Sequence, residues 1–312
     1  MSARVVFLGT PAFAVPSLDA LARLAARGEV EIVGVVTQPD RPGHRGRVTA
    51  PPVKERAAAL GLDVMQPARL DREAVAALLA RRPDALVWAA YGNLIPRALL
   101  DAVKGRAANV HASLLPRWRG AAPIQRAILA GDRETGVTLM EGTAALDAGP
   151  ILASARTPIA EDEDATSLTA RLADLGASLL GRELPRYLRG ELRGTPQDEA
   201  LVTWAPKLTA EDGALDFARP AEELARRVRA MTPEPGAFTT VRGKRIVVAR
   251  ASVDGGRPKE HGGLELRGGV PLVAAGAGWL RLDEVRPAGK RTMRGEDWAR
   301  GLRDIDGSRL PS

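Results

Sequence analysis

The chain has 312 residues, of which 45% are hydrophobic and 27% charged, with no cysteine and only three histidines. These values fit a globular protein of one or two domains, and the lack of cysteine excludes disulfides, thiol nucleophiles and cysteine-bound metal sites. The formal net charge of +7 favours an acidic partner such as nucleic acid, although an arginine-rich proteome would produce the same balance.

Apolar runs alternate with helical patterns through the first half of the chain. Strands are expected at Val5–Leu8, Ile32–Val36, Ala85–Ala89, Ala107–Ala112 and Gly136–Met140. Helices are expected from Pro16, after the N-cap Asp71, over Pro96–Val103, over Pro123–Ala130 and around Leu168–Leu179. This alternation predicts a Rossmann-like, doubly wound and mostly parallel α/β sheet, in which ligands bind at the carboxyl ends of the strands.

Two common nucleotide-binding patterns are missing. GTPAFA follows the first strand where a dinucleotide-binding protein has G-x-G-x-x-G, and no G-x-x-x-x-G-K-[ST] loop is present. The N-terminal apolar run is too short for a signal-peptide core or a membrane span, so we expect no membrane association and a cytoplasmic protein.

The pattern of the sequence changes near Pro206. A turn-rich connector, GELRGTPQ, precedes an amphipathic helix around Leu224 and Val228, and short β-like runs separated by glycines follow it. We therefore expect a first domain over residues 1–189, a linker over 190–205 and a small, OB-like β-barrel over 206–312. The last of these holds 20 Lys and Arg against 15 Asp and Glu, which is most of the excess positive charge.

A polar group surrounds His111 in the stretch NVHASLLPRWRG. Residues two apart on a strand share a face, so Asn109, His111 and Ser113 should project together. An amide donor beside an imidazole suits a reaction that develops negative charge on an oxygen. Asp147, in ALDAGP, is the candidate carboxylate partner. A hydrogen-bonded structural histidine remains the alternative at this point, and no G-x-S-x-G turn supports Ser113 as a nucleophile.

NVHASLLPRWRGAAPI resembles the signature of the 10-formyltetrahydrofolate-dependent formyltransferases, Asn-x-His-x-Ser-Leu-Leu-Pro followed by Arg-Gly-x-x-Pro-Ile, and ALDAGPIL is similar to their aspartate loop. RVVFLGTPAFAVPSL, VVTQPDRPGHRGR with APPVK, WAPKL, MTPEPGAFT and GKRTM resemble, in order, the branch that acts on methionyl-tRNA. Ala112 stands where the family usually has proline, and AAYGNLIP differs in its apolar residues from the family's Ala-Tyr-Gly-x-Ile-Leu-Pro run.

The resemblance implies transfer of a formyl group from N10 of 10-formyltetrahydrofolate to the α-amine of methionine on initiator tRNA. Tetrahydrofolate would be released and no metal would be needed. Asn109 and protonated His111 would stabilise the developing oxyanion. Asp147 would hold the His111 imidazole and help to take the amine proton. The residues implied to contact folate are Trp88, Tyr91, Gly92, Asn93, Ser113, Leu114, Leu115 and Pro116.

The resemblance also implies a tRNA-binding surface. Asp40–Arg56 is rich in cations, glycine and proline, and is expected to be a loop that reaches the acceptor stem; a solvated surface loop is the alternative. The implied tRNA contacts are Arg41, Arg45, Arg47, Lys54, Lys207, Arg226, Arg229, Lys244 and Arg245, with Lys290 and Arg291 as further cations.

Three other functions are compatible with parts of the sequence. They are formyl transfer to a small amine, folate-dependent hydrolysis with water in place of the amine, and RNA binding without catalysis. The basic loop and basic second domain favour tRNA over a small amine, and the intact Asn109, His111 and Asp147 favour an enzyme. We expect a monomer in a bacterial cytosol.

Overall fold

A computed structural model describes residues 2–42, 48–302 and 307–310. The chain divides into two compact units. The first contains Met1–Pro123, Glu134–Pro158 and Thr169–Ala205, and the second contains Ile124–Arg133, Ile159–Leu168 and Pro206–Ser312.

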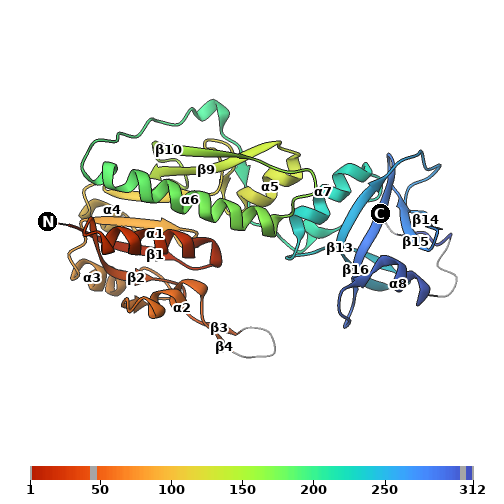
Figure 1. The fold of residues 1–312 in the computed structure, drawn as a ribbon, viewed down its shortest axis with the longest axis horizontal. Helices are drawn as coiled ribbons and strands as arrows, with labels where there is room; N and C mark the ends of the chain where they lie inside the picture. Colours follow the sequence, from red (N-terminus) through yellow and green to blue (C-terminus); the bar gives the residue numbers. More distant parts are fainter. Residues whose placement is uncertain (1, 43–47, 303–306, 311–312) are drawn as a thin grey trace. The chain divides into compact units, whose positions relative to one another are not determined.

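A seven-stranded sheet in the order β10-β9-β7-β6-β1-β2-β5 forms the centre of the first unit (Figure 1). Its strands are β1 (Ala3–Gly9), β2 (Val30–Val36), β5 (Val64–Met65), β6 (Ala85–Ala89), β7 (Ala107–His111), β9 (Glu134–Glu141) and β10 (Ile151–Pro158). The first five pair in parallel, whereas β9 is antiparallel to both β7 and β10. The predicted doubly wound, mostly parallel sheet is confirmed.

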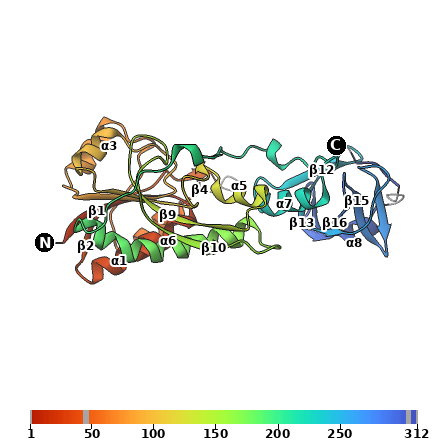
Figure 2. The ribbon, with the colours of Figure 1, turned by 90° about the horizontal axis from the view of Figure 1, so that it is seen from above.

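Helices cover both faces of this sheet, with α1 and α6 on one face and α3 on the other (Figure 2). The helices are α1 (Val15–Ala26), α2 (Pro52–Ala59), α3 (Arg72–Leu79), α4 (Arg97–Ala102) and α6 (Ala165–Leu188). Short elements complete the first unit: η1 (Ala12–Ala14), β3 (Arg41–Pro42), β4 (Val48–Thr49), β8 (Arg119–Gly120), η3 (Glu199–Leu201) and β11 (Trp204–Ala205).

The helix packing decides which face of β7 carries polar groups. Gly176 of α6 approaches Val110 so closely that a Cβ there would lie 2.7 Å from the Val110 Cγ1 atom. The Val110 face of β7 is therefore filled by helix. Because side chains alternate along a strand, Asn109 and His111 project from the opposite face. On that face Leu86 of β6 belongs to a core cluster that also contains Leu78 of α3 and Leu99 of α4.

Two expectations for the first unit need correction. Asp40–Arg56 is not a loop throughout, because α2 begins at Pro52 and carries Lys54 and Arg56. Proline suits this first turn, where its missing N–H has no intrahelical partner. Strand β10 was not among the expected strands, because this edge strand consists of small and polar residues, its burial alternates and its apolar signal is weak.

An antiparallel sheet forms most of the second unit. Its path is β12-β13-β16-β15-β14, with β17 paired to β16. The elements are α5 (Pro123–Ala130), η4 (Glu211–Gly213), α7 (Ala221–Met231), β12 (Ala237–Val241), β13 (Lys244–Asp254), β14 (Leu264–Arg267), β15 (Val270–Ala274), β16 (Trp279–Pro287), β17 (Met293–Arg294) and α8 (Gly295–Arg300). The predicted small β domain is present, and within the described ranges β12 and β14 stay at the ends of the path without closing a barrel by direct pairing.

Within the described parts of the chain, no helix combines the length and the apolarity that crossing a membrane requires.

The Asp71 N-cap provides a test of local folding. Its side chain accepts a hydrogen bond from the Ala74 amide at 2.9 Å, as the sequence predicted. Asp71→Ala should lower the free energy of unfolding by about 1 kcal/mol, because the first turn of α3 loses that acceptor. Asp71→Asn retains a side-chain oxygen and should stay close to the parent in thermal unfolding. Equal destabilisation by both variants would contradict the capping role.

Candidate active site

Three side chains far apart in the sequence meet beside β7. The Asn109 Nδ2 atom lies 3.3 Å from Asp147 Oδ1, and His111 Nδ1 lies 3.6 Å from Asp147 Oδ2. Asn109 and His111 are 5% and 6% exposed, so charge on Asp147 acts on both through little water. The structure thus brings together the amide, imidazole and carboxylate singled out in the sequence.

Asp147 reaches this group by an unexpected path. Since β9 is antiparallel to β7, Glu141 at its carboxyl end lies opposite Ala108, at the start of β7. The loop after β9 must therefore turn back over the sheet to bring Asp147 to His111. Gly142 permits the first step, because a Cβ there would lie 2.1 Å from the Trp88 ring.

Both nitrogens of His111 face oxygen acceptors. Nε2 lies 2.9 Å from the Trp118 carbonyl oxygen and Nδ1 faces the Asp147 carboxylate. The Nε2 contact has hydrogen-bond length, whereas the Nδ1 contact with the carboxylate is longer. The ring is therefore held between a backbone carbonyl and a carboxylate.

The Asp147 carboxylate has a third contact. Its Oδ2 atom accepts the Gly120 amide hydrogen at 3.0 Å. Gly120 adopts a φ of +123°, and a Cβ there would lie 2.6 Å from the Ala205 carbonyl oxygen. Only glycine combines this backbone conformation with such a close approach, so Gly120 holds the carboxylate in place.

The segment after His111 is anchored against β9. Thr138 Oγ1 donates to the Ser113 carbonyl oxygen at 2.7 Å and accepts from the Leu115 amide at 3.1 Å. The Ser113 hydroxyl donates to the Arg117 carbonyl oxygen at 2.6 Å rather than joining Asp147. Ser113 therefore lies on the predicted segment, but its hydroxyl stabilises the turn that follows instead of contacting Asp147. Leu114 is half-buried against Gly136.

The Trp88–Asn93 segment continues from β6, the other strand next to the site. Trp88 pairs with Asn109 across β6 and β7. The Tyr91 carbonyl oxygen accepts from Thr10 Oγ1 at 3.1 Å and Gln38 Nε2 at 3.2 Å, which fixes the turn at Gly92. Burial raises the pKa of the Tyr91 phenol.

The predicted cationic loop is described only in part. Arg45 and Arg47 lie outside the described residues. Arg41 is exposed and hydrogen-bonds to Gln38. Lys54 Nζ pairs with the Asp40 carboxylate at 2.7 Å, and the hydrogen bonds from Gln66 and Lys54 lower the pKa of Asp40. Lys54 is thus already neutralised by a neighbouring carboxylate.

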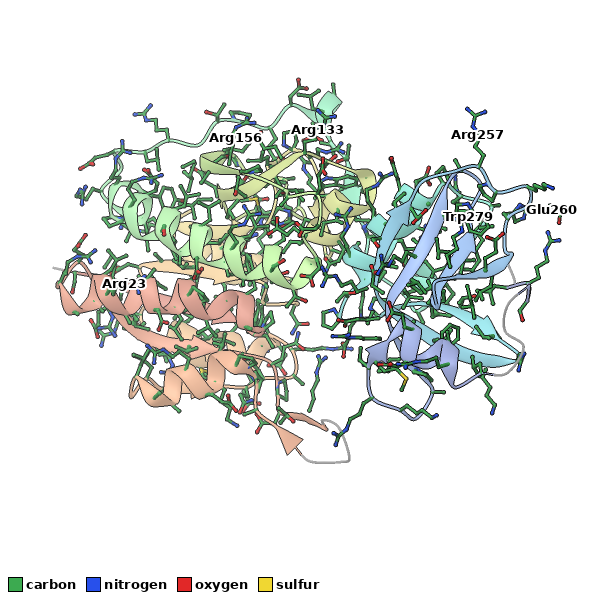
Figure 3. The ribbon with its side chains drawn as sticks, turned by 45° about the vertical axis from the view of Figure 1, so that its right-hand side comes forward. Arg23, Arg133, Arg156, Arg257, Glu260 and Trp279 are labelled. Atoms are coloured by element: carbon green, nitrogen blue, oxygen red, sulfur yellow. The ribbon has the colours of Figure 1, made fainter. Side chains whose placement is uncertain are left out.

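The predicted cations of the second unit occupy two kinds of surroundings. Lys207, Lys244 and Arg245 are exposed, and the Arg245 guanidinium lies 3.6 Å from the Phe238 ring centroid. Arginines outside the predicted set are exposed as well, in each unit by itself, as Arg156 and Arg257 illustrate (Figure 3). Exposure of a cation is therefore weak grounds by itself for an RNA contact.

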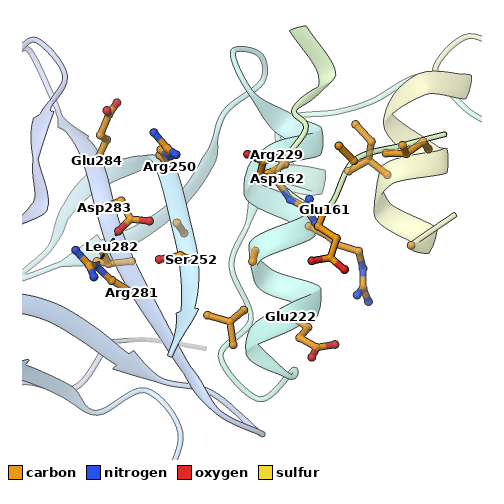
Figure 4. Close-up of a pocket in the computed structure, with 18 of the residues that line it drawn as sticks. Glu161, Asp162, Glu222, Arg229, Arg250, Ser252, Arg281, Leu282, Asp283 and Glu284 are labelled. Atoms are coloured by element: carbon orange, nitrogen blue, oxygen red, sulfur yellow. Dashed lines mark ion pairs between the residues drawn. The ribbon is translucent and has the colours of Figure 1, made fainter. Parts of the chain in front are cut away.

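Arg226 and Arg229 line a cavity of about 1260 Å³ within the second unit (Figure 4). Six arginines and seven carboxylates line it, namely Arg133, Arg226, Arg229, Arg250, Arg281, Arg294, Asp132, Glu161, Asp162, Glu222, Asp283, Glu284 and Glu296. Burial, followed by the charge of Arg226, lowers the pKa of Arg229. The cavity is thus nearly balanced in charge, unlike a groove lined by cations alone.

Sequence reasoning missed the residues that hold the aspartate loop. Gln197 donates to the Asp147 carbonyl oxygen at 2.9 Å and to that of Gly149 at 2.7 Å. Its Oε1 atom accepts from Arg119 Nε at 3.0 Å. No spacing rule links position 197 to position 147, because only the folded chain brings them together.

Gly120→Ala tests the anchoring of the carboxylate. The new Cβ would overlap the Ala205 carbonyl oxygen, in addition to the strain that any side chain has at this positive φ. Gly61→Ala is the matched control, since Gly61 also has a positive φ but open space around its Cβ position. Urea unfolding should show a larger loss of stability for Gly120→Ala. Equal losses of stability would mean that Ala205 can move away from Gly120 at no measurable cost.

Comparison with known proteins agrees with this geometry. The Formyl transferase family profile matches residues 3–184, and the Formyl transferase, C-terminal domain profile matches residues 207–303. A methionyl-tRNA formyltransferase of Halorhodospira halophila is 48% identical over 98% of this chain and 99% of its own length. One from Thermus thermophilus is 47% identical over the same shares.

Among solved structures, HypX from Aquifex aeolicus in complex with tetrahydrofolic acid is similar in fold. Its TM-score is 0.65 at 22% identity, over 98% of this chain and 48% of HypX. Both family profiles, the relatives that match end to end and the Asn109–His111–Asp147 geometry agree on one conclusion. The chain belongs to the formyl transferase family.

Proposed function

We propose that the protein transfers the formyl group of 10-formyltetrahydrofolate to the α-amino group of methionine on initiator methionyl-tRNA, for translation initiation. The observation that carries this proposal is the convergence of Asn109, His111 and Asp147 in a chain that matches methionyl-tRNA formyltransferases over nearly its whole length. The reaction is an acyl transfer, and it releases tetrahydrofolate.

The chemistry requires stabilisation of charge on the formyl oxygen. As the methionine nitrogen bonds to the formyl carbon, negative charge develops on that oxygen. Asn109 has two amide hydrogens, and the contact with Asp147 uses one of them. The other can donate to the developing oxyanion, and the positive charge of protonated His111 can stabilise the same oxygen electrostatically, in a site where low exposure strengthens each interaction.

The proton inventory balances through the same residues. The attacking nitrogen loses a proton, and N10 of the folate gains one when its bond to the formyl carbon breaks. Asp147 and His111 form a pair that can accept the first proton and hold it within the site. His111, or water beside it, then donates to N10 of the leaving tetrahydrofolate.

The loops around the site fit a folate substrate. An aromatic ring system needs apolar surface, and Leu94 and Leu146 are 72% and 51% exposed on the loops after β6 and β9. These loops adjoin Trp88–Asn93 and Asp147. We assign folate contacts to the accessible Trp88, Gly92, Asn93, Leu114 and Pro116, with the buried Tyr91, Ser113 and Leu115 of the same two segments supporting them from behind.

Positive charge supports a tRNA substrate over a small amine. A small amine needs neither a cation-rich Asp40–Arg56 segment nor a second unit with excess positive charge. Arg41, Arg45, Arg47 and Lys207 are the foremost candidates for phosphate contacts. Lys244 and Arg245 come next, while Lys54, Arg226 and Arg229 must compete with neighbouring carboxylates. The proposal implies a bacterial cytoplasmic enzyme that acts as a monomer.

The first test measures formyl transfer from 10-formyltetrahydrofolate to methionyl initiator tRNA. The parent should transfer the group, and His111→Ala should abolish transfer. Asn109→Ala should lower kcat at least about a hundredfold, since an oxyanion donor contributes about 2.7–4 kcal/mol. A loss below about threefold would remove Asn109 from that role. Folate turnover on small amines without transfer to tRNA would retain the chemistry and overturn the tRNA substrate.

The tRNA contacts are tested by salt dependence. The double variant Arg45→Ala/Arg47→Ala should weaken tRNA binding and reduce the slope of log K against log salt by about 0.7–0.9 for each lost phosphate contact. The control is Arg23→Ala/Arg257→Ala, which removes two exposed arginines elsewhere. Unchanged activity of the first variant on formylatable tRNA would exclude the loop from binding.

A further inference from the structure

The connector after α6 returns to the active site instead of linking two units loosely. Thr195 and Ile151 exchange backbone hydrogen bonds of 2.9 and 2.8 Å. Further on, the Trp118 amide donates to Thr203 Oγ1 at 2.9 Å, and β11 pairs in parallel with β8. In Figure 1 this connector is the long irregular segment that follows α6. It is therefore built into the first unit on both sides of Gln197.

Gln197 holds the backbone of the catalytic loop at two points. Its Nε2 atom donates to the carbonyl oxygens of Asp147 and Gly149 at 2.9 and 2.7 Å. These bonds lie on either side of Ala148, so they fix the peptide that follows Asp147. The side chain of Asp147 leaves this same stretch of backbone toward Asn109 and His111.

The orientation of the Gln197 amide is set by its partners. Its two N–H hydrogens face two carbonyl oxygens, and its oxygen faces the Nε atom of Arg119 at 3.0 Å. A flipped amide would place oxygen against two oxygens and NH₂ against a guanidinium. Arg119 is only 3% exposed and is held in turn by Glu199 at 2.8 Å, so the amide is anchored from behind.

Asp147 needs such an anchor because its backbone is strained. Its φ is +48°, in the left-handed region that costs a non-glycine residue roughly 1–3 kcal/mol unless its surroundings enforce it. Gly149 adds a tight constraint, since a Cβ there would lie 1.8 Å from the Glu141 carbonyl oxygen. Without Gln197 the loop can relax, and the Asp147 carboxylate would then move relative to His111.

We propose that Gln197 is a positioning residue for formyl transfer, which acts by holding the backbone of Asp147 through two hydrogen bonds and ties the connector to the catalytic group. This inference rests on the proposed function for its kinetic consequence. Its structural content, the coupling of Gln197 to the Asp147–His111 contact, stands independently of the substrate.

Two substitutions separate positioning from simple support of Arg119. Gln197→Glu keeps the side-chain length and the contact with Arg119, but it places a carboxylate oxygen against the two carbonyl oxygens. Gln197→Met keeps the length and removes both sets of contacts. Gln125→Glu on α5 makes the same chemical change elsewhere and is the control.

Steady-state formyl transfer should show a kcat effect for both Gln197 variants. A misplacement of about 1 Å costs up to a hundredfold in rate, so we expect kcat to fall on the order of tenfold to a hundredfold. The KM values for both substrates should change less than about twofold, because Gln197 touches neither substrate in this scheme. Gln125→Glu should match the parent.

A second readout uses the scarcity of histidine. With three histidines in the chain, the His111 imidazole resonances can be assigned by comparison with His111→Ala. Both Gln197 variants should shift these resonances in the absence of substrate, while thermal unfolding remains a single transition as in the parent. This measurement reports the Asp147–His111 contact whether or not the tRNA reaction is the right one.

The outcomes are distinguishable. Parent-like kcat and parent-like His111 resonances in Gln197→Glu would overturn the positioning role and leave Arg119 support as the only function of this side chain. Shifted resonances with no formyl transfer even by the parent would sustain the positioning of Asp147 and refute the proposed substrate. Raised KM values with unchanged kcat would also overturn the inference, because Gln197 would then act on binding.

Discussion

The Asp147 carboxylate is the group on which the candidate active site depends. One of its oxygens faces Asn109, and the other faces both His111 and the Gly120 amide. A carboxylate in such a nearly buried place costs free energy unless it is paired and hydrogen-bonded; Asn109 and the Gly120 amide donate to it, and the His111 imidazole lies 3.6 Å away. The same contacts orient the amide and the imidazole, so one carboxylate positions both groups that are proposed to stabilise the oxyanion.

Maintaining that carboxylate requires unusual backbone at several places. Asp147 adopts a positive φ, and Gly120 and Gly142 allow approaches that a Cβ would block. Strain of this kind survives when the surrounding structure enforces it. The enforcement comes from the β8–β11 pairing and from Gln197, both of which draw on the connector. A segment expected to act as a linker therefore contributes to the stability of the Asp147 loop.

The second unit shows that counting charges overstates an electrostatic surface. Its excess of basic residues is real, yet Arg226 and Arg229 lie in a cavity with more carboxylates than arginines. Lys207, Lys244 and Arg245 are exposed, and they are not among the residues that line this cavity. Since cations attract phosphate only to the extent that nearby anions leave them uncompensated, position matters more than number for RNA binding.

The sequence by itself determined the strand and helix alternation and the Asp71 cap, and it singled out Asn109, His111 and Asp147 as one group. These follow from local rules, namely apolar periodicity, capping and residue type, together with a motif resemblance that runs along most of the chain. Only the tertiary structure decided that β9 runs antiparallel to β7, since hydrophobic runs carry no information about strand direction. That reversal sends the Asp147 loop back past Trp88, where Gln197 bonds the Asp147 backbone carbonyl and the Gly120 amide bonds its carboxylate. Such long-range contacts depend on packing between distant segments, which no spacing in a single sequence encodes.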